Sequence, residues 1–375
     1  MRGHILRRGR ESWAVVVDLG RDPMTGKRRQ SWRTVRGTKR DAEELLTRLL
    51  HERDLGVEVR PGRLTLAQFL ERWLQDYARP NTAPKTFLRY SQLVRVHLVP
   101  ALGTIPLGKL RPLHIQGAYS AIQAKRVAAR TVLHCHRVLR EALGHAVKWQ
   151  LLGRNAADDV GAPRADRPEV KAPNAEELRC LLVAAESTSL GALVHAASMT
   201  GLRLGELMGL RWQDLDLDAG ILRVLQTAQW LPRQGVIFKQ PKTARSRRTV
   251  DLSPGTVGRL RQHRQEQLQA RLLVGPAYED RDLVFATAVG TALDPGNVRR
   301  TWARIVDAAG LNGVRFHDLR HAHASLMLQQ GVHVKIISER LGHSGIGITM
   351  DTYGHLVPGL QAQAAAALDQ LIKAR

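Results

Sequence analysis

Residues 314–355 read VRFHDLRHAHASLMLQQGVHVKIISERLGHSGIGITMDTYGH, a stretch that combines two helical runs with arginine, histidine and tyrosine side chains. His317 and Arg320 are three residues apart, which puts both on one face of a helix. A second helical run ends at the Leu-Gly-His sequence that contains His343, and glycine is typical of a helix end. Tyr353 follows ten residues later. A guanidinium, imidazoles and a phenol in one stretch are the groups needed to attack a phosphodiester without a metal ion.

The charge of the chain points to a polyanionic partner. Its 375 residues include 57 Lys and Arg against 34 Asp and Glu, a formal net charge of +23. Each phosphate that a protein neutralises releases counterions, so such an excess favours nucleic acid. The ordinary alternative is a soluble basic protein. The hydrophobic fraction of 43% is sufficient for a packed core, and the length suits two or three domains.

The two cysteines give no metal motif and no disulfide framework. Cys135 and Cys180 are far apart in apolar helical runs, so we expect buried, reduced thiols. The basic N-terminus lacks the apolar core of a signal peptide, and no apolar run is long enough to span a bilayer. We therefore expect a soluble protein of the cytoplasm that makes no membrane contact.

Residues 1–60 are predicted to form a small sheet-plus-helix module. Strands are expected at 13–19 and 28–35, around a turn at 22–27, and a helix follows from about 38. The segment holds 15 basic and 9 acidic residues. A sheet face that carries Arg and Trp can enter a DNA groove, although a solvated basic sheet is the ordinary alternative.

Residues 61–165 have a helical pattern throughout. Thr65 and Gln68 have the spacing of a capping box at the start of the first helix. With 16 basic and 5 acidic residues, this is the most one-sidedly basic part of the chain. We expect a helical bundle that grips the backbone of duplex DNA.

Residues 166–375 are predicted to form a third, α+β domain. A linker rich in proline and charge, at 161–169, precedes Asn174, which is expected to cap a new helix. Strands are expected at 220–227, 235–238 and 249–252, with helices before and after them. The expected fold class is therefore mostly α with small β elements.

Two further basic residues are candidates for the site. Arg203 stands near a helix start beside glycines, and a guanidinium there can bind two phosphate oxygens. Glu206, three residues on, could hold Arg203, although such pairs usually lie on protein surfaces. Lys242 is placed at the tip of a hairpin between two expected strands, where its ammonium could protonate a leaving alkoxide. A solvated lysine is the ordinary alternative.

His317 and His321 also have the spacing of metal ligands on a helix. A zinc helix of the His-Glu type would need Glu at position 318, which is Asp318. No convincing further ligand lies nearby, so no metal and no cofactor is expected. Tyr353 lies among small and polar residues, which predicts a phenol that is available for covalent chemistry.

Taken together and in this order, these motifs resemble the tyrosine recombinase (phage integrase) family. The residues that carry the resemblance are TGLRLGEL, PKTARSRRTV, HDLRHAHAS, LGHS and DTYGH, within about 174–360. The helical segment is similar, more loosely, to the core-binding domain of the family, and the first module resembles its arm-binding domain. The resemblance thus implies an arm-type DNA-binding domain at 1–60, a core-site DNA-binding domain at 61–165 and a catalytic domain with a tail at 166–375.

The resemblance also implies a role for each candidate residue. Arg203 and Arg320 would bind the scissile phosphate. Further hydrogen bonds would come from His317, which could also move protons, and from His343. Lys242 would be the general acid on the 5′ oxygen. Tyr353 would form a 3′-phosphotyrosine, with Glu206 as a support.

The function that the resemblance implies is site-specific integration and excision of a phage or mobile element. The enzyme would need no metal, because two guanidiniums and two imidazoles can stabilise the charged transition state. It would need no ATP, because the phosphotyrosine stores the bond energy. Four protomers would assemble on double-stranded DNA with core and arm sites, in the host cytoplasm and nucleoid, with a directionality factor or a DNA-bending protein as possible partners. The alternatives are a chromosome or plasmid dimer resolvase, a topoisomerase-like nicking and closing enzyme, and a DNA-binding regulator that does not cleave.

Overall fold

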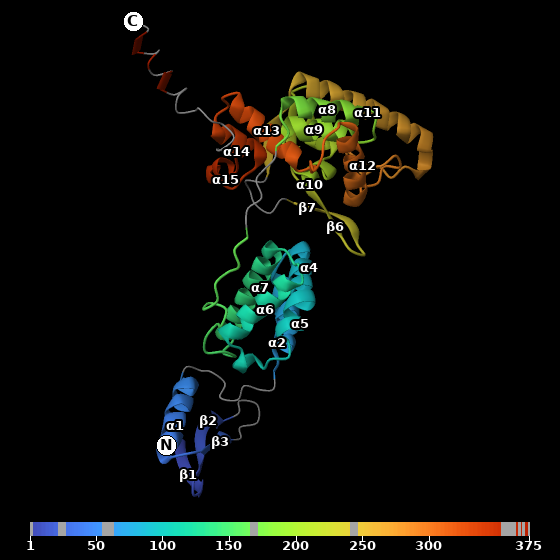
Figure 1. Cartoon of the computed structure of the whole chain (residues 1–375). Helices are drawn as coiled ribbons and strands as arrows, with labels where there is room; N and C mark the ends of the chain where they lie inside the picture. Colours follow the sequence, from blue (N-terminus) through green and yellow to red (C-terminus); the bar gives the residue numbers. More distant parts are fainter. Residues whose placement is uncertain are drawn as a thin grey trace. The chain divides into compact units, whose positions relative to one another are not determined.

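The structure of the chain, a computed structural model, describes residues 3–21, 28–54, 64–165, 172–240 and 247–353 and a few positions after 364. It divides into two compact units, Met1–Arg167 and Pro168–Arg375. The described elements are mostly helices, with small antiparallel sheets in both units (Figure 1). The fold class predicted from the sequence is therefore confirmed. No helix in the described part of the chain is long and apolar enough to cross a membrane.

The N-terminal module is a three-stranded sheet with one helix. Its elements are β1 (Gly3–Gly9), β2 (Ser12–Arg21), β3 (Arg28–Arg36) and α1 (Lys39–Asp54). The β-branched residues Val15 and Val17 on one face of β2 are buried in a cluster with Ala42 and Leu49 of α1. β1 was not predicted from the sequence, since four of the seven residues in GHILRRG are Gly or Arg. The turn expected at 22–27 lies outside the described residues.

The second part of this unit is a bundle of helices around one apolar core. Its elements are α2 (Leu66–Trp73), η1 (Leu74–Ala78), α3 (Arg79–Asn81), α4 (Pro84–Leu93), η2 (Val94–Leu98), α5 (Val99–Leu102), η3 (Leu107–Lys109), α6 (Pro112–Ala124) and α7 (Ala129–Lys148). The predicted capping box is confirmed: Thr65 accepts from the Gln68 amide, and the Gln68 side chain accepts from the Thr65 amide.

Two long helices of this bundle contain a wide π-helical turn: one is made of α2, η1 and α3, and the other of α4, η2 and α5. The segments η1 and η2 each interrupt a continuous helix, and each ends two residues before a proline, Pro80 and Pro100. Proline has no amide hydrogen, and its ring clashes with the carbonyl four residues earlier. A wide turn at this point lets the helix continue past the proline, which explains why both long helices remain helical beyond it.

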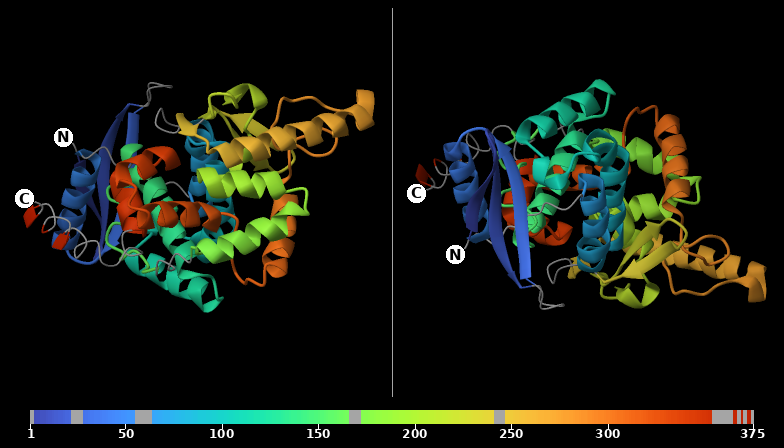
Figure 2. Two further views of the ribbon diagram at one scale, coloured as in Figure 1. Left: turned by 90° about the horizontal axis from the view of Figure 1, so that it is seen from above. Right: turned by 90° about the horizontal axis from the view of Figure 1, so that it is seen from below.

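The C-terminal unit carries the candidate site. Its helices are α8 (Ala175–Glu186), α9 (Gly191–Thr200), α10 (Leu204–Met208), η4 (Trp212–Asp214), α11 (Pro254–Val274), η6 (Gly275–Ala277), α12 (Pro295–Ala308), α13 (Asp318–Gln329), α14 (Val334–Leu341) and α15 (Ile346–Tyr353). Asn174 caps α8 as expected and accepts from the amides of Glu176 and Glu177. The helices α13, α14 and α15 lie together beside α8 and α9 (Figures 1 and 2).

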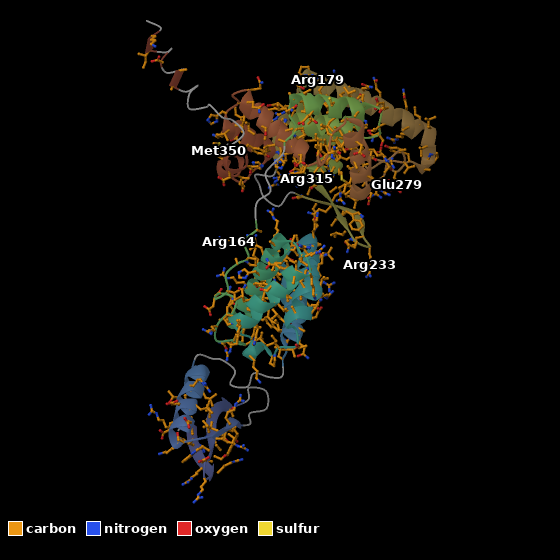
Figure 3. All side chains as sticks on the ribbon, viewed as in Figure 1. Arg164, Arg179, Arg233, Glu279, Arg315 and Met350 are labelled. Atoms are coloured by element: carbon orange, nitrogen blue, oxygen red, sulfur yellow. The ribbon has the colours of Figure 1, made fainter. Side chains whose placement is uncertain are left out.

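The strands of this unit differ from the prediction. They are β4 (Leu215–Asp216), β5 (Ile221–Val224), β6 (Thr227–Leu231), β7 (Gly235–Lys239) and β8 (Arg248–Asp251). β4, β5 and β8 form one sheet, while β6 and β7 form a separate hairpin. Figure 3 labels Arg233 at the turn of this hairpin. The expected pairing of 235–238 with 249–252 is therefore wrong, because the unpredicted strand β6 pairs with β7 instead.

One of the cysteine predictions is also wrong. Cys135 is buried in the bundle core, but Cys180 is exposed. Leu178 and Leu181 form the buried face of α8. Cys180 lies two residues from Leu178, and side chains two apart on a helix do not share a face. Both thiols are free.

Candidate active site

Arg320 is the centre of the candidate site. It lies on α13 and is only 3% exposed. Its two terminal nitrogens donate to the carbonyl oxygens of Gly201 and Leu341, each at 2.7 Å. The first carbonyl precedes the start of α10 by a few residues, and the second is at the end of α14. One buried guanidinium therefore links the segments that carry Arg203 and His343.

The close approach at Gly201 needs glycine. This residue ends α9 with a φ of 65°, in the left-handed region. A Cβ atom here would lie 2.6 Å from Leu341 and 2.7 Å from His323. Both backbone conformation and space therefore exclude a side chain between α9, α13 and α14.

Arg203 stands at the N-terminal cap of α10 and is held by Glu206. Its Nη1 donates to Glu206 Oε1 at 2.9 Å, and its amide donates to Oε2 at 2.9 Å. The predicted contact is confirmed, but the pair is not an ordinary surface pair, because Glu206 is only 6% exposed. The Arg203 side chain is 42% exposed, so part of its guanidinium is open to a ligand.

A second arginine reaches the same carboxylate from β8. Arg248 donates to Glu206 Oε2 at 2.9 Å and to the carbonyl of Arg340 at 2.7 Å. Burial alone would raise the pKa of the Glu206 carboxyl, but the hydrogen bond and charge of Arg248, with those of Arg203, hold it below its ordinary value. Glu206 is therefore ionised, and it fixes β8 and α10 to each other.

The electrostatics of Arg320 favour an anionic ligand. Burial, followed by the positive charge of Arg203, lowers the pKa of Arg320 to about 9. Glu206 acts in the opposite direction but does not cancel these effects. The site thus holds a partly uncompensated concentration of positive charge, and an anion placed there would relieve the repulsion.

His343 follows the left-handed Gly342 that ends α14, whose φ is 64°. Its Nδ1 lies 2.8 Å from the hydroxyl of Thr349, a residue with no exposed surface. Burial, then Arg320 and Arg203, lower the pKa of His343 to about 4, so the ring is neutral at pH 7. If the Thr349 hydroxyl donates to Nδ1, the other ring nitrogen carries the hydrogen and can donate to a ligand.

His317 and His321 flank the first turn of α13. His317 is exposed and occupies the N-terminal cap position, whereas His321 is half-buried. Neighbouring protein atoms partly shield the His317 ring from water, and this desolvation, followed by the charge of Arg320, lowers its pKa. The two rings meet edge to face with their centroids 4.9 Å apart. Among the described residues, no group of three or more His, Cys, Asp or Glu could hold a metal ion.

Tyr353 is at the end of α15, and its environment differs from the prediction. The sequence suggested an accessible phenol, yet the residue is only 1% exposed and packs with Ala324, Ile337 and Leu341. Burial raises the pKa of the phenol, and the charges of Arg320 and Arg203 act against this rise. The local sequence is polar, but α15 turns this side chain toward the apolar residues of α13 and α14.

Lys242 lies outside the described residues. Its neighbours in the chain are β7, which ends at Lys239, and β8, which starts at Arg248. The structure therefore brings together Arg203, Glu206, His317, Arg320, His343 and Tyr353, and it leaves the position of Lys242 open.

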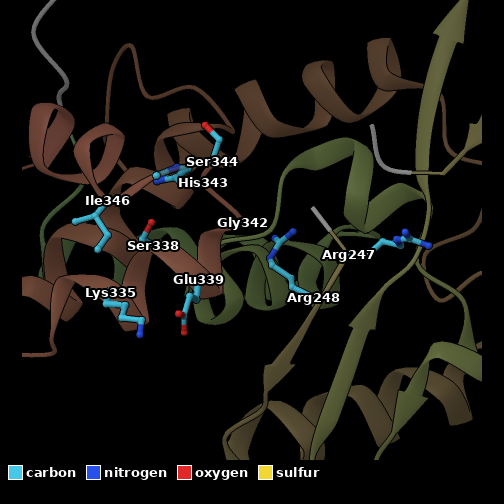
Figure 4. A pocket seen from close by; sticks show the side chains of 10 residues that line it. Arg247, Arg248, Lys335, Ser338, Glu339, Gly342, His343, Ser344 and Ile346 are labelled. Carbon is cyan, nitrogen blue, oxygen red and sulfur yellow. The ribbon is translucent and has the colours of Figure 1, made fainter. Parts of the chain in front are cut away.

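A pocket of about 500 Å³ adjoins His343 (Figure 4). Basic side chains from two directions line it, Arg247 and Arg248 from the β8 segment and Lys335 from α14. Ser338 and Ser344 add hydroxyl groups. These groups are suited to phosphate oxygens next to the site.

Sequence reasoning missed three residues of this site. Arg248 lies within the quoted PKTARSRRTV motif, but a run of basic residues gives no sign of which one is buried. Thr349 carried no signal of its own. His321 was considered only as a metal ligand, because its contact with Tyr353 joins residues 32 positions apart.

Comparisons with known proteins place most of the chain in one family. The phage integrase family matches residues 174–358, and the N-terminal SAM-like domain of phage integrases matches residues 65–122. An integrase of Streptomyces ambofaciens is 31% identical over 376 residues, which cover 97% of this chain and 94% of the relative. A "Tyrosine recombinase XerC-like" protein of Caldanaerobacter subterraneus subsp. tengcongensis is 29% identical, with 98% of each chain covered.

Solved structures share the fold. The Tn1549 transposon integrase in complex with a circular intermediate DNA superposes with a TM-score of 0.70, at 17% identity, over 82% of this chain and 99% of that chain. The lambda integrase tetramer bound to a Holliday junction gives a TM-score of 0.58, at 20% identity, over 93% of this chain and 94% of that chain.

Fold and site together define a DNA strand-transfer enzyme of the site-specific recombinase class. The chain belongs to the phage integrase family of tyrosine recombinases.

Proposed function

We propose that this recombinase integrates and excises a phage or other mobile element by way of a 3′-phosphotyrosine at Tyr353. The observation that carries the proposal is the position of Arg320. Its guanidinium contacts the segments that bear Arg203 and His343, and the next residue, His321, contacts the Tyr353 phenol. A phosphodiester held by the guanidiniums of Arg203 and Arg320 would lie beside the phenol oxygen.

Each charged group of the site has a role in this reaction. Arg203 and Arg320 bind the non-bridging oxygens of the scissile phosphate, because guanidiniums bind such oxygens in pairs. Glu206 accepts two hydrogen bonds from Arg203 and holds its guanidinium in place. His317 and His343 donate further hydrogen bonds, and together these groups stabilise the charge of the pentacoordinate transition state.

Lys242 is the proposed general acid. As the Tyr353 oxygen forms its bond to phosphorus, the bond to the 5′ oxygen breaks, and the ammonium of Lys242 gives that oxygen a proton. The chain position of Lys242 supports this role, since the next described strand begins at Arg248, which touches Glu206. Neither a metal ion nor ATP takes part in this scheme.

The N-terminal module is proposed as the arm-type DNA-binding domain, at residues 1–60. One face of its sheet packs on α1. The other face carries Trp32, which is 50% exposed, and the Arg8 guanidinium lies over its ring at 5.7 Å. Arg36 pairs with Ser12 on the same face. A basic sheet face of this kind fits the major groove.

The helical bundle is proposed as the core-site DNA-binding domain, at residues 61–165. An open pocket of about 560 Å³ follows α7 and is lined by Arg137, Arg140 and Lys148, among other residues. The segment as a whole has 16 basic and 5 acidic residues. Its charge supports contacts to phosphates, which position a protein on DNA without reading its sequence. The catalytic domain with its tail then spans 166–375.

The proposed assembly is a tetramer that brings two DNA duplexes together. Its support is the lambda integrase structure, which is a tetramer bound to a Holliday junction. A directionality factor or a DNA-bending protein would choose between integration and excision. The enzyme would act on the nucleoid in the bacterial cytoplasm, in keeping with its bacterial and phage relatives.

Adduct formation on a suicide DNA substrate tests this proposal. Such a substrate carries a nick close to the cleavage site. Cleavage therefore releases a short fragment with a free 5′-hydroxyl, which diffuses away and leaves the protein attached to the 3′ phosphate of the other fragment. The unaltered protein should form the adduct, with or without EDTA, and Tyr353→Phe should not. A DNA-binding regulator would give no adduct with either protein. Integration on attachment-site DNA distinguishes the integrase from a dimer resolvase.

A further inference from the structure

The phenol of Tyr353 has a specific partner that the proposed roles do not use. The hydroxyl oxygen lies 2.7 Å from Nδ1 of His321, which is the hydrogen bond that the described residues provide for it. The ring centroids are 5.5 Å apart. His321 follows Arg320 directly on α13, so the phosphate-binding cation and this imidazole are fixed to the same helical turn.

Burial makes this contact chemically important. A phenol must lose its proton as its oxygen attacks phosphorus, and water is the usual acceptor at an exposed site. Tyr353 is only 1% exposed. Its neighbours Ala324, Ile337 and Leu341 are apolar and fully buried, and they cannot accept a proton. The proton therefore needs a protein group within hydrogen-bonding distance.

The other basic groups that the structure describes in the site are poorly placed for this task. The two terminal nitrogens of Arg320 donate to backbone carbonyls. His343 Nδ1 is engaged with the Thr349 hydroxyl. The His317 ring packs edge to face with the His321 ring, and among the described residues the hydrogen bond to the phenol comes from His321 instead.

We propose that His321 is a catalytic residue that accepts the Tyr353 proton during DNA cleavage and returns it during rejoining. This inference rests on the proposed function of Tyr353 as the nucleophile. In cleavage, the Oη–P bond forms as the O–H bond breaks, and the proton moves to Nδ1 of His321. The P–O5′ bond breaks, and the 5′ oxygen takes its proton from the general acid. In rejoining, the imidazolium protonates the departing phenol oxygen.

The charge environment of His321 suits an acceptor. Burial and then His317 lower its pKa to about 4, so the imidazole is neutral and free to accept at pH 7. Arg315, Arg320 and His343 also face the ring with positive or potentially positive charge, while Asp318 opposes them. A bound phosphodiester adds negative charge beside these cations. It thereby raises the basicity of His321 when the proton has to move.

The decisive variant is His321→Asn in the full-length protein. The Asn side chain places an amide oxygen near the position of Nδ1, so it can still accept a hydrogen bond from the phenol, but it cannot take up the proton. We expect adduct formation on the suicide substrate to slow by about 10²- to 10⁴-fold, the usual contribution of general base catalysis. DNA affinity and thermal unfolding should change little. His321→Ala, which removes the hydrogen bond too, should be at least as slow.

The matched control is His333→Asn. His333 is exposed and accepts from the Lys335 amide at the start of α14. Asn can make the same cap, so this variant carries the same chemical change away from the phenol. It should form the adduct at the rate of the unaltered protein.

A substrate with sulfur in place of the bridging 5′ oxygen separates the two proton transfers. Its thiolate leaves without protonation, so it should rescue Lys242→Ala, which lacks the general acid. It should not rescue His321→Asn, because the phenol must still lose its proton. In the unaltered protein the rate should fall as pH decreases through the pKa of DNA-bound His321, and His321→Asn should lose this dependence.

Three results would overturn the inference. One is a His321→Asn protein that forms the adduct at the normal rate with the normal pH profile. Another is faster cleavage by His321→Ala, which would make the contact a restraint on Tyr353. The third is rescue of His321→Asn by the sulfur substrate. A different failure, in which the unaltered protein forms no adduct through Tyr353, would refute the proposed function itself.

Discussion

At the scale of single residues, the site depends on one buried carboxylate between two arginines. Glu206 binds Arg203 on α10 and Arg248 on β8, and Arg248 also binds the carbonyl of Arg340 at the end of α14. Burying this charge is costly, and two charged hydrogen-bonding partners offset the cost. The network thus sets the direction of the Arg203 guanidinium while leaving part of it open to DNA.

Replacing this carboxylate tests the network. Glu206→Gln removes the buried negative charge that Arg203 and Arg248 share, and we expect the free energy of unfolding to fall by about 3–5 kcal/mol, as for other broken buried pairs. Chemical denaturation measures this loss. Arg281→Gln is the control, because its partner Glu279 is about half exposed and the pair should contribute little. A loss no larger than that of the control would contradict the role given to Glu206.

The buried histidines predict how stability depends on pH. The pKa values of His321, His323 and His343 are lowered to about 4, mainly by burial. Between the ordinary histidine pKa of about 6.5 and these values, the unfolded chain binds more protons than the folded one. Stability should therefore fall as pH decreases from about 6.5 to 4. Melting temperatures across this range, without DNA, measure the effect.

A control for this prediction replaces His323, one of the three histidines whose pKa is lowered to about 4. His323→Asn removes one buried imidazole without touching Tyr353, and it should flatten the slope even if the protein is less stable overall. A melting temperature that does not vary between pH 6.5 and 4 in the unaltered protein would contradict neutral, buried histidines.

At the scale of secondary-structure elements, the ends of α9 and α14 bring the catalytic groups together. Both helices end in a left-handed glycine, Gly201 and Gly342. These ends allow Arg320 to reach the carbonyls beside them. The α13 helix thus serves as a rigid support, and the residues at its first turn face the phosphate site and the phenol.

Gly201→Ala tests this arrangement. Gly310→Ala is the matched control, because Gly310 also has a positive φ, of 70°, but a Cβ there meets open space. Both changes cost the backbone strain of about 1–2 kcal/mol. Only Gly201→Ala adds contacts below 3 Å, with Leu341 and His323. It should therefore lower the melting temperature further and slow adduct formation, and equal effects of the two variants would contradict the account.

The elements also show what the sequence could predict. Helix starts with a local signal, such as the boxes at Thr65 and Asn174, were predicted correctly because the partners are three residues apart. The strand order around β7 was wrong because the short strand β6 was not recognised, and because the pairing of β8 with β5, far earlier in the chain, is decided by nonlocal contacts. The burial of Tyr353 and its contact with His321 were missed for the same reason: they depend on how α13 and α15 pack.

At the scale of the whole molecule, the proposal divides DNA binding from catalysis. The C-terminal unit contains every described residue of the candidate site, while the sheet module and the helical bundle contribute basic surfaces. The order of the motifs in the C-terminal unit was enough to predict the family from the sequence alone. The sequence contains no comparably specific motif for the sheet module, whose role rests on its exposed Arg and Trp residues.

Removing residues 1–60 tests this division. The module has its own sheet, helix and apolar cluster, so the remaining chain keeps both of its larger cores. We expect the shortened protein to form adducts on core-site DNA at nearly the normal rate, whereas integration into complete attachment sites is impaired. Equal integration by the shortened and complete proteins would contradict the arm-site assignment.

The central claim is that Tyr353 becomes covalently linked to DNA. The most direct measurement is to trap the adduct on the suicide substrate, digest the protein and identify by mass spectrometry which residue carries the nucleotide. The account predicts a 3′-phosphate linked to the oxygen of Tyr353. A nucleotide on any other residue, or a linkage through a 5′-phosphate, would contradict it.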